Sequence, residues 1–179
     1  MALFVITAVA GLVLAVVYSV TKEPILASQK AKINNAIKMV IPEFESVKDT
    51  TVWPKTGKDS VRIHALLKGA ESAGYAIETY TDNGFSGRFT LMVGFFPDGS
   101  ISNIEVLEHK ETPGLGTKMA LPAFKGQFKG LKISDLPGEE LKIKNDGGTV
   151  DAITAATISS RGFCDAVNRA YSTFKKEKK

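Results

Sequence analysis

The first twenty residues constrain this chain more than any other segment. Nineteen consecutive residues, Ala2–Val20, carry no charge and are rich in Leu, Val, Ala, Ile and Phe. As a helix this run would be about 28 Å long, close to the roughly 30 Å hydrocarbon core of a bilayer. A cleaved signal peptide would have a basic start and a shorter apolar core, and a buried core helix would carry a polar stripe. The sequence therefore predicts an uncleaved, single-pass anchor over residues 2–21.

The charges around the anchor give conflicting indications of its orientation. Four lysines follow the apolar run, at positions 22, 30, 32 and 38, and none precedes it. The positive-inside rule would place the rest of the chain in the cytoplasm, but that rule is weak for long translocated domains. Met1 lies at the edge of the apolar stretch, so further residues upstream are an open alternative. Charge alone leaves the orientation undecided.

The net charge of +4 comes from the C-terminus. Residues 1–160 hold 17 Lys and Arg against 17 Asp and Glu, whereas residues 161–179 hold six against two. A basic tail over 176–179 does not indicate a nucleic-acid-binding face, and no nucleic-acid partner is expected. The single cysteine, Cys164, excludes an intrachain disulfide framework, a cysteine-ligated iron–sulfur cluster and a cysteine-rich zinc site.

Hydrophobic periodicity predicts the elements after the anchor. Residues 22–60 are expected to form a helix over 27–40 and then a connecting region. Period-two alternation predicts four strands, at 61–67, 74–81, 89–96 and 101–108. The turn Pro97-Asp98-Gly99-Ser100 predicts a hairpin between the last two.

The remaining segments complete an α+β domain over residues 61–175. A short helix is expected over 119–128, and edge strands over 141–143 and 149–152. A closing helix is predicted over 160–175, where four apolar residues share one face: Phe163, Val167, Tyr171 and Phe174. The predicted fold is an antiparallel sheet with flanking helices, tethered by one N-terminal transmembrane helix.

Motifs of ordinary enzyme chemistry are absent from the sequence. No Gly-x-Gly-x-x-Gly opens a helix, and there is no Walker loop. Gly84–Arg88 does not match the nucleophile elbow of hydrolases. His64 and His109 lack ligand spacing to each other and are predicted to be surface or half-buried strand residues, and Cys164 a small core residue. No catalytic residue and no metal site is predicted.

Two segments are harder to explain as structure alone. Glu111-Thr112-Pro113-Gly114-Leu115-Gly116-Thr117-Lys118 is either an ordinary strand-to-helix loop or a loop that brings bare backbone close to a flat ligand. Asp151–Ser160 places two threonines among small residues before the closing helix. Either Ser159 or Ser160 caps that helix, or the helix N-terminus binds a phosphate.

Together these segments resemble the FMN-binding domain of bacterial respiratory complexes. The resemblance spans the chain: an anchor followed by Thr-Lys-Glu-Pro, a mixed domain, Glu-Thr-Pro-Gly-Leu-Gly, and a Thr-small-Ala-Thr loop before the last helix. That family includes the G subunit of Rnf-type electron-transport complexes and the C subunit of sodium-pumping NADH:quinone oxidoreductases. The short chain and the compact Glu-Thr-Pro-Gly-Leu-Gly loop favour the G subunit.

The resemblance implies a covalent flavoprotein. FMN would be joined through its phosphate to the hydroxyl of Thr157, with Thr154 as the rival position, by a flavin transferase that uses FAD and recognises a pattern beginning at Asp151. The other implied cofactor-binding residues are Ala155, Ala156, Ile158, Glu111, Thr112, Gly114, Leu115, Gly116 and Lys118. The family usually has glycine where this chain has Ala155, so strain is expected there if that position needs a positive φ.

The resemblance also implies a role and a location. The chain would relay electrons in a ferredoxin:NAD⁺ oxidoreductase coupled to ion translocation, as one component of a membrane complex rather than an enzyme alone. The flavin domain would lie on the outer, periplasmic face of the cytoplasmic (inner) membrane. Two alternatives stay open: the C subunit of a sodium pump, and a non-redox, membrane-tethered scaffold module.

Overall fold

The computed structural model describes residues 1–178, which form two units. The first unit, Met1–Asn35, is helical and belongs to α1 (Ala2–Val40). Its apolar side chains are exposed, and α1 is long and apolar enough to cross a membrane. The predicted anchor and the predicted helix over 27–40 are thus parts of one helix, which continues through Pro24. Proline removes only one backbone donor there, so the flanking turns persist.

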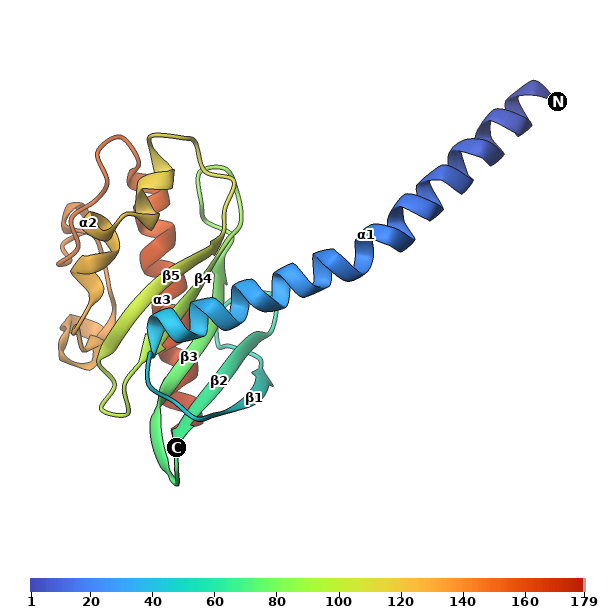
Figure 1. The fold of residues 1–179 in the computed structure, drawn as a ribbon. Coiled ribbons are helices and arrows are strands. Elements are labelled where there is room, and N and C mark those ends of the chain that lie inside the picture. The colour runs from blue at the N-terminus through green and yellow to red at the C-terminus, as the bar shows by residue number, and fades with distance from the viewer. Residues whose placement is uncertain (179) are drawn as a thin grey trace. The chain divides into compact units, whose positions relative to one another are not determined.

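The second unit begins at Ala36 and is built on a five-stranded antiparallel sheet. Its strands are adjacent in chain order (Figure 1): β1 (Ser46–Val52), β2 (Val61–Lys68), β3 (Glu71–Thr81), β4 (Phe89–Phe95) and β5 (Ile101–Glu108). Four strands confirm the sequence prediction, with bounds that differ by up to three residues. The Pro97–Ser100 hairpin is also confirmed: Gly99 has φ 87°, and Ser100 donates its backbone N–H to the Asp98 carboxylate at 2.9 Å.

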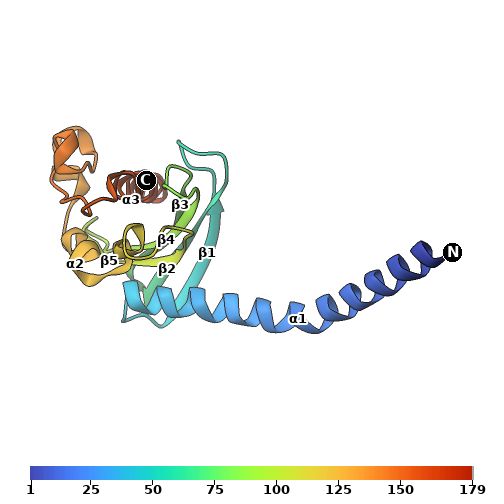
Figure 2. The ribbon, with the colours of Figure 1, turned by 90° about the horizontal axis from the view of Figure 1, so that it is seen from above.

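The C-terminal helix α3 (Thr157–Glu177) covers one face of the sheet, packed mainly on β3 and β4 (Figure 2). The predicted apolar face is confirmed, since Phe163, Val167, Tyr171 and Phe174 are all buried. Phe174 stacks on Phe95 of β4 with ring centroids 5.0 Å apart. Cys164 is buried as predicted. This packing fixes the position of the α3 N-terminus relative to the sheet.

The last residues of α1 cover the other face of the sheet within this second unit. Ala36, Ile37 and Val40 are buried. A Cβ added at Gly94 of β4 would meet Val40 Cβ at 2.8 Å, and Ser102 donates a hydrogen bond to the Val40 carbonyl. Glycine at position 94 therefore allows the helix end to approach the sheet closely.

The segment between β5 and α3 has little regular structure. It contains α2 (Pro122–Lys125) and short 3₁₀ turns, η1 (Gly116–Ala120), η2 (Gly126–Phe128), η3 (Ile133–Asp135), η4 (Pro137–Glu139) and η5 (Lys144–Asp146). Phe124 and Phe128 bury their rings against Phe163 of α3, at 5.1 and 4.9 Å. The segment is thus held by its aromatic side chains.

Several expected boundaries were wrong. Residues 43–60 are not only a connection, because β1 forms there. The helix expected over 119–128 is a series of short turns, and the edge strands expected over 141–143 and 149–152 reduce to one isolated bridge, Ile143–Val150. His64 is more buried than expected, with Nδ1 2.7 Å from the Asp49 carboxylate. His109 is half-buried.

Candidate functional site

The N-terminus of α3 begins three residues earlier than the sequence predicted. The helix starts at Thr157 with Ala156 as N-cap, and in the described chain no side chain caps it. Ser159 and Ser160 lie inside the first turn, so the alternative in which one of them caps the helix is wrong. Ser160 instead accepts a hydrogen bond from the Ile153 backbone N–H at 2.9 Å, which ties the preceding loop to the helix.

This helix end has the electrostatic character of an anion site. The Ser160 backbone N–H donates to the Ala156 carbonyl at 3.0 Å and so makes the first bond of the helical ladder. The amides of Thr157, Ile158 and Ser159 precede it, and such first-turn donors lack intrahelical partners. In a helix of 21 residues the peptide dipoles add positive potential at the same end. A phosphate group fits this position.

The loop before the helix is strained at one residue. Ala155 has φ 61°, in the left-handed region that glycine prefers. The sequence predicted strain at Ala155 only if this position has a positive φ, and the structure meets that condition. Left-handed backbone costs a residue with a Cβ roughly 1–2 kcal/mol, so the surrounding contacts hold Ala155 against its own preference.

The Glu-Thr-Pro-Gly-Leu-Gly loop forms a tight turn between β5 and η1. The Thr112 carbonyl accepts the backbone N–H groups of Leu115 and Thr117 at 3.2 and 3.4 Å. Gly114 has φ 77°, and its N–H donates to the Thr117 hydroxyl at 3.0 Å. The turn leaves the Leu115 side chain exposed.

Glu111, at the start of this loop, is buried. Its Oε2 accepts the Ser159 hydroxyl at 2.6 Å, and its Oε1 accepts the Ser86 backbone N–H at 3.1 Å. Three segments that are far apart in sequence therefore meet at one carboxylate: the 84–87 loop, the 111–116 loop and the first turn of α3.

A cavity of about 320 Å³ opens where these segments meet, within the usual range for ligand pockets. Its lining is mostly apolar, with few polar groups. The lining residues are Phe85, Glu111, Thr112, Leu115, Gly116, Ala155, Ala156, Thr157, Ile158 and Ser159. The two sequence segments singled out as unexplained therefore form one concave site.

Four of the expected site residues do not line this cavity. Thr154 is exposed and lies outside it, and Gly114 and Lys118 are on the exposed side of their turn. Asp151 is exposed and pairs with Lys144 at 2.7 Å. Of the two candidate threonines, only Thr157 lines the cavity.

The 84–87 loop also contributes to the cavity, and the sequence did not predict this contribution. Phe85 lines the cavity while 65% of it is exposed, and Ser86 provides the backbone donor to Glu111. The sequence signal for this loop is Gly84-Phe85-Ser86-Gly87, a glycine-flanked turn that does not match the nucleophile elbow. Gly84 is required because an added Cβ would lie 2.7 Å from the Glu111 carboxylate and 2.9 Å from Phe89.

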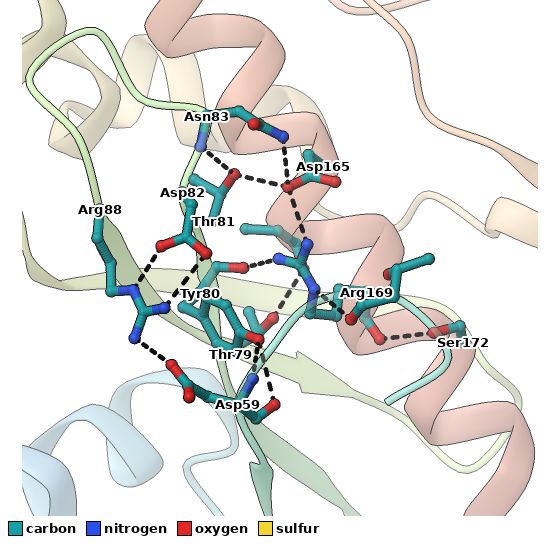
Figure 3. A network of polar contacts seen from close by, with 12 residues as sticks. Asp59, Thr79, Tyr80, Thr81, Asp82, Asn83, Arg88, Asp165, Arg169 and Ser172 are labelled. Carbon is teal, nitrogen blue, oxygen red and sulfur yellow. Dashed lines mark hydrogen bonds and ion pairs between the residues drawn. The ribbon is translucent and has the colours of Figure 1, made fainter. Parts of the chain in front are cut away.

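A polar network anchors the base of the 84–87 loop (Figure 3). Asp165 of α3 accepts hydrogen bonds from Thr81, Asn83 and Arg169, at 2.6, 3.4 and 3.2 Å. At the other end of the loop Arg88 pairs with Asp82 at 2.6 Å and lowers the pKa of that carboxyl, chiefly by hydrogen bonding. Both ends of the loop are thus fixed to the sheet or to α3.

Buried Arg169 extends this network to the 53–60 region. Its guanidinium donates to the carbonyls of Thr56, at 2.9 Å, and Tyr80. The Tyr80 ring lies near the guanidinium carbons of both Arg88 and Arg169, at 4.4 and 4.7 Å. Figure 3 shows the tyrosine between the two arginine side chains.

Within the residues that the structure describes, we find neither a metal cluster nor a reactive thiol. No cluster of three or more His, Cys, Asp or Glu side chains that could hold a metal ion occurs in that part of the chain. Burial raises the pKa of the Cys164 thiol to about 12, so this cysteine is not a nucleophile near neutral pH.

Comparison with known proteins agrees with the site geometry. The FMN-binding domain family matches residues 84–172, a range that contains every residue lining the cavity. The G subunit of the ion-translocating oxidoreductase complex of Methanosarcina acetivorans is 33% identical over 170 residues, which cover 93% of this chain and 87% of that protein. The chain belongs to the G-subunit family of ion-translocating oxidoreductase complexes.

Other G subunits are similar over comparable lengths. The one from Aliivibrio fischeri ES114 is 29% identical, over 99% of this chain and 90% of its own. The G subunit of the proton-translocating ferredoxin:NAD⁺ oxidoreductase complex of Clostridium ljungdahlii is 29% identical, over 90% and 82%. Membership in this family supports a membrane-anchored chain and argues against the non-redox scaffold.

Solved structures confirm the fold. The crystal structure of the C subunit of Na⁺-translocating NADH-quinone reductase from Parabacteroides distasonis superposes with a TM-score of 0.63 at 19% identity, covering 86% of this chain and 95% of that one. The crystal structure of NqrC from Shewanella oneidensis superposes with a TM-score of 0.54 at 20% identity, covering 72% of this chain and 70% of that one. The predicted α+β architecture with an antiparallel sheet is therefore confirmed.

Proposed function

We propose that this G-subunit protein carries FMN covalently, through a phosphoester to the hydroxyl of Thr157. The observation that carries the proposal is the position of Thr157, which begins an uncapped 21-residue helix and lines the cavity, whereas Thr154 does neither. The first-turn amides and the helix dipole would hold the phosphate beside this hydroxyl. Ser159 is a poor acceptor because its hydroxyl already donates to Glu111.

The other cavity residues would hold the flavin ring. Phe85, Leu115 and Ile158 supply exposed apolar side chains around the opening, and Gly116 supplies bare backbone. A Cβ at Gly116 would collide with the Glu111 side chain and lie 2.7 Å from the Ser159 hydroxyl, so a side chain there would displace two residues that line the cavity. Bound FMN supplies reversible electron transfer, and the protein supplies orientation, tethering and electrostatics.

The role we propose is electron relay within a multi-subunit ferredoxin:NAD⁺ oxidoreductase coupled to ion translocation. A covalent cofactor on an anchored domain suits such a role, since the flavin cycles between redox states without leaving the protein. The identities to G subunits support this complex over the alternative sodium-pumping quinone reductase, because the likeness to the C subunit is one of fold.

Maturation would require a flavin transferase that uses FAD. The Thr157 hydroxyl oxygen would attack the phosphorus on the FMN side of the FAD pyrophosphate. A phosphoester bond to Thr157 would form, the pyrophosphate bond would break with AMP leaving, and the hydroxyl proton would be released. Asp151, at the start of the loop, is exposed and available for recognition by the transferase. We further propose that the domain lies on the outer face of the cytoplasmic membrane, as the family resemblance implies.

Replacement of Thr157 tests the attachment site. The full chain, produced in a host that has the flavin transferase, should be yellow and should keep in-gel flavin fluorescence after denaturation. Thr157→Ala should abolish that fluorescence while the circular dichroism spectrum stays that of a folded protein. Thr149→Ala is the matched control: this threonine is exposed and lies upstream of Asp151, and its loss should leave the fluorescence unchanged.

Two results would count against the proposal. A colourless wild-type chain from that host would reject covalent flavin altogether. Flavin mass on Thr154 or Ser159 in peptide maps would reject Thr157 as the attachment site. The proteins that co-purify test the role: iron–sulfur and NADH-oxidising partners are expected for the ferredoxin-linked complex, and quinone-reductase partners would point to the sodium pump.

A further inference from the structure

Glu111 stands out among the acidic side chains of the second unit. It is 4% exposed, whereas the other acidic residues are more exposed. Its two hydrogen bonds come from a backbone amide and a hydroxyl, and within residues 1–178 it forms no ion pair with a lysine, arginine or histidine. Buried carboxylates without a cation are costly unless hydrogen bonds satisfy them. An unpaired charge kept at such a cost calls for an explanation.

The Glu111 carboxylate lies between the walls of the cavity and contacts more than one of them. The walls are the 84–87 loop, the 111–116 loop and the first turn of α3. One carboxylate oxygen accepts a hydrogen bond from Ser86 in the 84–87 loop, and the other accepts one from Ser159 in the first turn of α3. The glycines at 84 and 116 leave the space that the carboxylate fills, because a Cβ at either position would meet it. The α3 N-terminus adds favourable potential for a negative charge.

We propose that Glu111 is a positioning residue of the flavin site: its carboxylate joins the three walls of the cavity, and its negative charge lowers the reduction potential of the flavin held there. The proposal rests on FMN binding in this cavity. Reduction adds electrons to the flavin, and a nearby buried anion opposes the added negative charge. In a poorly solvated site that opposition is screened less than it would be at the surface.

Glu111→Gln separates the charge from the contacts. The glutamine amide has nearly the same shape, and it can accept the Ser86 N–H through oxygen and donate to the Ser159 hydroxyl through nitrogen. The walls should therefore stay joined, and the flavin should remain bound. The one-electron reduction equilibrium should favour the reduced flavin at least tenfold more, a rise in midpoint potential of about 59 mV.

The test is a redox titration of the flavin-loaded full chain in detergent. Glu108→Gln is the matched control: this glutamate is exposed at the end of β5, and its loss should leave the potential unchanged. An unchanged potential in Glu111→Gln would overturn the electrostatic role. Loss of flavin from Glu111→Gln would overturn the positioning role, because the amide can make the same two contacts.

A flavin-free measurement tests the positioning role independently. Full chain from a host without the flavin transferase would be unfolded with urea as wild type, Glu111→Ala, Ser159→Ala and the double variant. If the carboxylate joins the walls, the two losses are coupled, and the double variant is scarcely less stable than Glu111→Ala. Additive losses would overturn the proposal. If the wild type binds no flavin in a host with the transferase, the proposed function is rejected. The flavin-free comparison of unfolding free energies would still test whether Glu111 and Ser159 are coupled.

Discussion

At the residue scale, Ala155 holds a backbone conformation that its side chain disfavours. Its φ of 61° predicts that Ala155→Gly raises the free energy of unfolding by about 1 kcal/mol, since the relief of strain exceeds the added entropy of the unfolded chain. Urea unfolding of the full chain in detergent measures the change. Ala156→Gly is the control, because Ala156 has φ −139° and is buried, so its replacement should destabilise. Equal losses in both variants would contradict the strain at 155.

Burial of Cys164 makes the free energy of unfolding fall as the pH rises in the alkaline range. Burial raises its pKa from about 9 to about 12, so the folded state keeps the thiol protonated. Its contribution is fully present below pH 9 and is lost as the pH rises toward 12. Relative to Cys164→Ala, the wild type should lose roughly 2 kcal/mol between about pH 8 and 11.

Thiol labelling checks the same residue directly. A disulfide reagent at about pH 8 should leave Cys164 unmodified in the native protein and react promptly in denaturant, because only unfolding exposes the thiol. Rapid labelling of the native chain would show that the helix face around Cys164 opens more easily than its burial implies.

At the scale of elements, Arg169 connects α3 to the sheet and to the 53–60 region. Arg169→Met would leave the carbonyls of Thr56 and Tyr80 and the Asp165 carboxylate without this donor. The expected loss is roughly 3 kcal/mol in the free energy of unfolding. Arg161→Met is the control on the same helix: its pair with Asp146 is exposed and should be worth less than about 1 kcal/mol. Similar losses in the two variants would contradict the importance of this network.

The same scale shows which elements the sequence could predict. Strands β2 to β5 bury one or both faces, so their apolar residues mark them clearly. Strand β1, Ser-Val-Lys-Asp-Thr-Thr-Val, lies at the sheet edge with most side chains exposed, and it carries little hydrophobic signal. The expected edge strands near 143 and 150 fail because Gly147 and Gly148 turn the chain tightly; a Cβ at Gly148 would collide with Lys142.

The site was predictable only in part, for a related reason. Local sequence marks the two loops that contain Glu111 and Thr157. The 84–87 loop, with Phe85, joins them only through long-range contacts, such as the hydrogen bond from Ser86 to Glu111. Neither Phe85 nor Ser86 belongs to a sequence pattern that would indicate this contact. The start of α3 was misplaced because Thr157 lacks a side-chain cap, the usual signal of a helix N-terminus.

At the scale of the whole molecule, two features of the chain bear on which side of the membrane holds the flavin domain. The lysines at 22, 30, 32 and 38 favour the cytoplasm, whereas the family resemblance implies the outer face. We expect the outer face, because the charge rule is reliable only for loops shorter than about 60 residues and the domain is much longer. A long domain that follows an apolar anchor helix can be translocated across the membrane despite those lysines.

Protease accessibility decides between the two orientations. Protease added to intact spheroplasts should digest the domain, while a cytoplasmic marker protein survives; permeabilised cells provide the control in which both are cut. Attachment at Thr157 supplies a second readout, since an outer domain would be flavinylated only where the flavin transferase is exported. A domain that survives in intact spheroplasts and still carries flavin would place both the lysines and the transferase in the cytoplasm, and the charge rule would then outweigh the family resemblance.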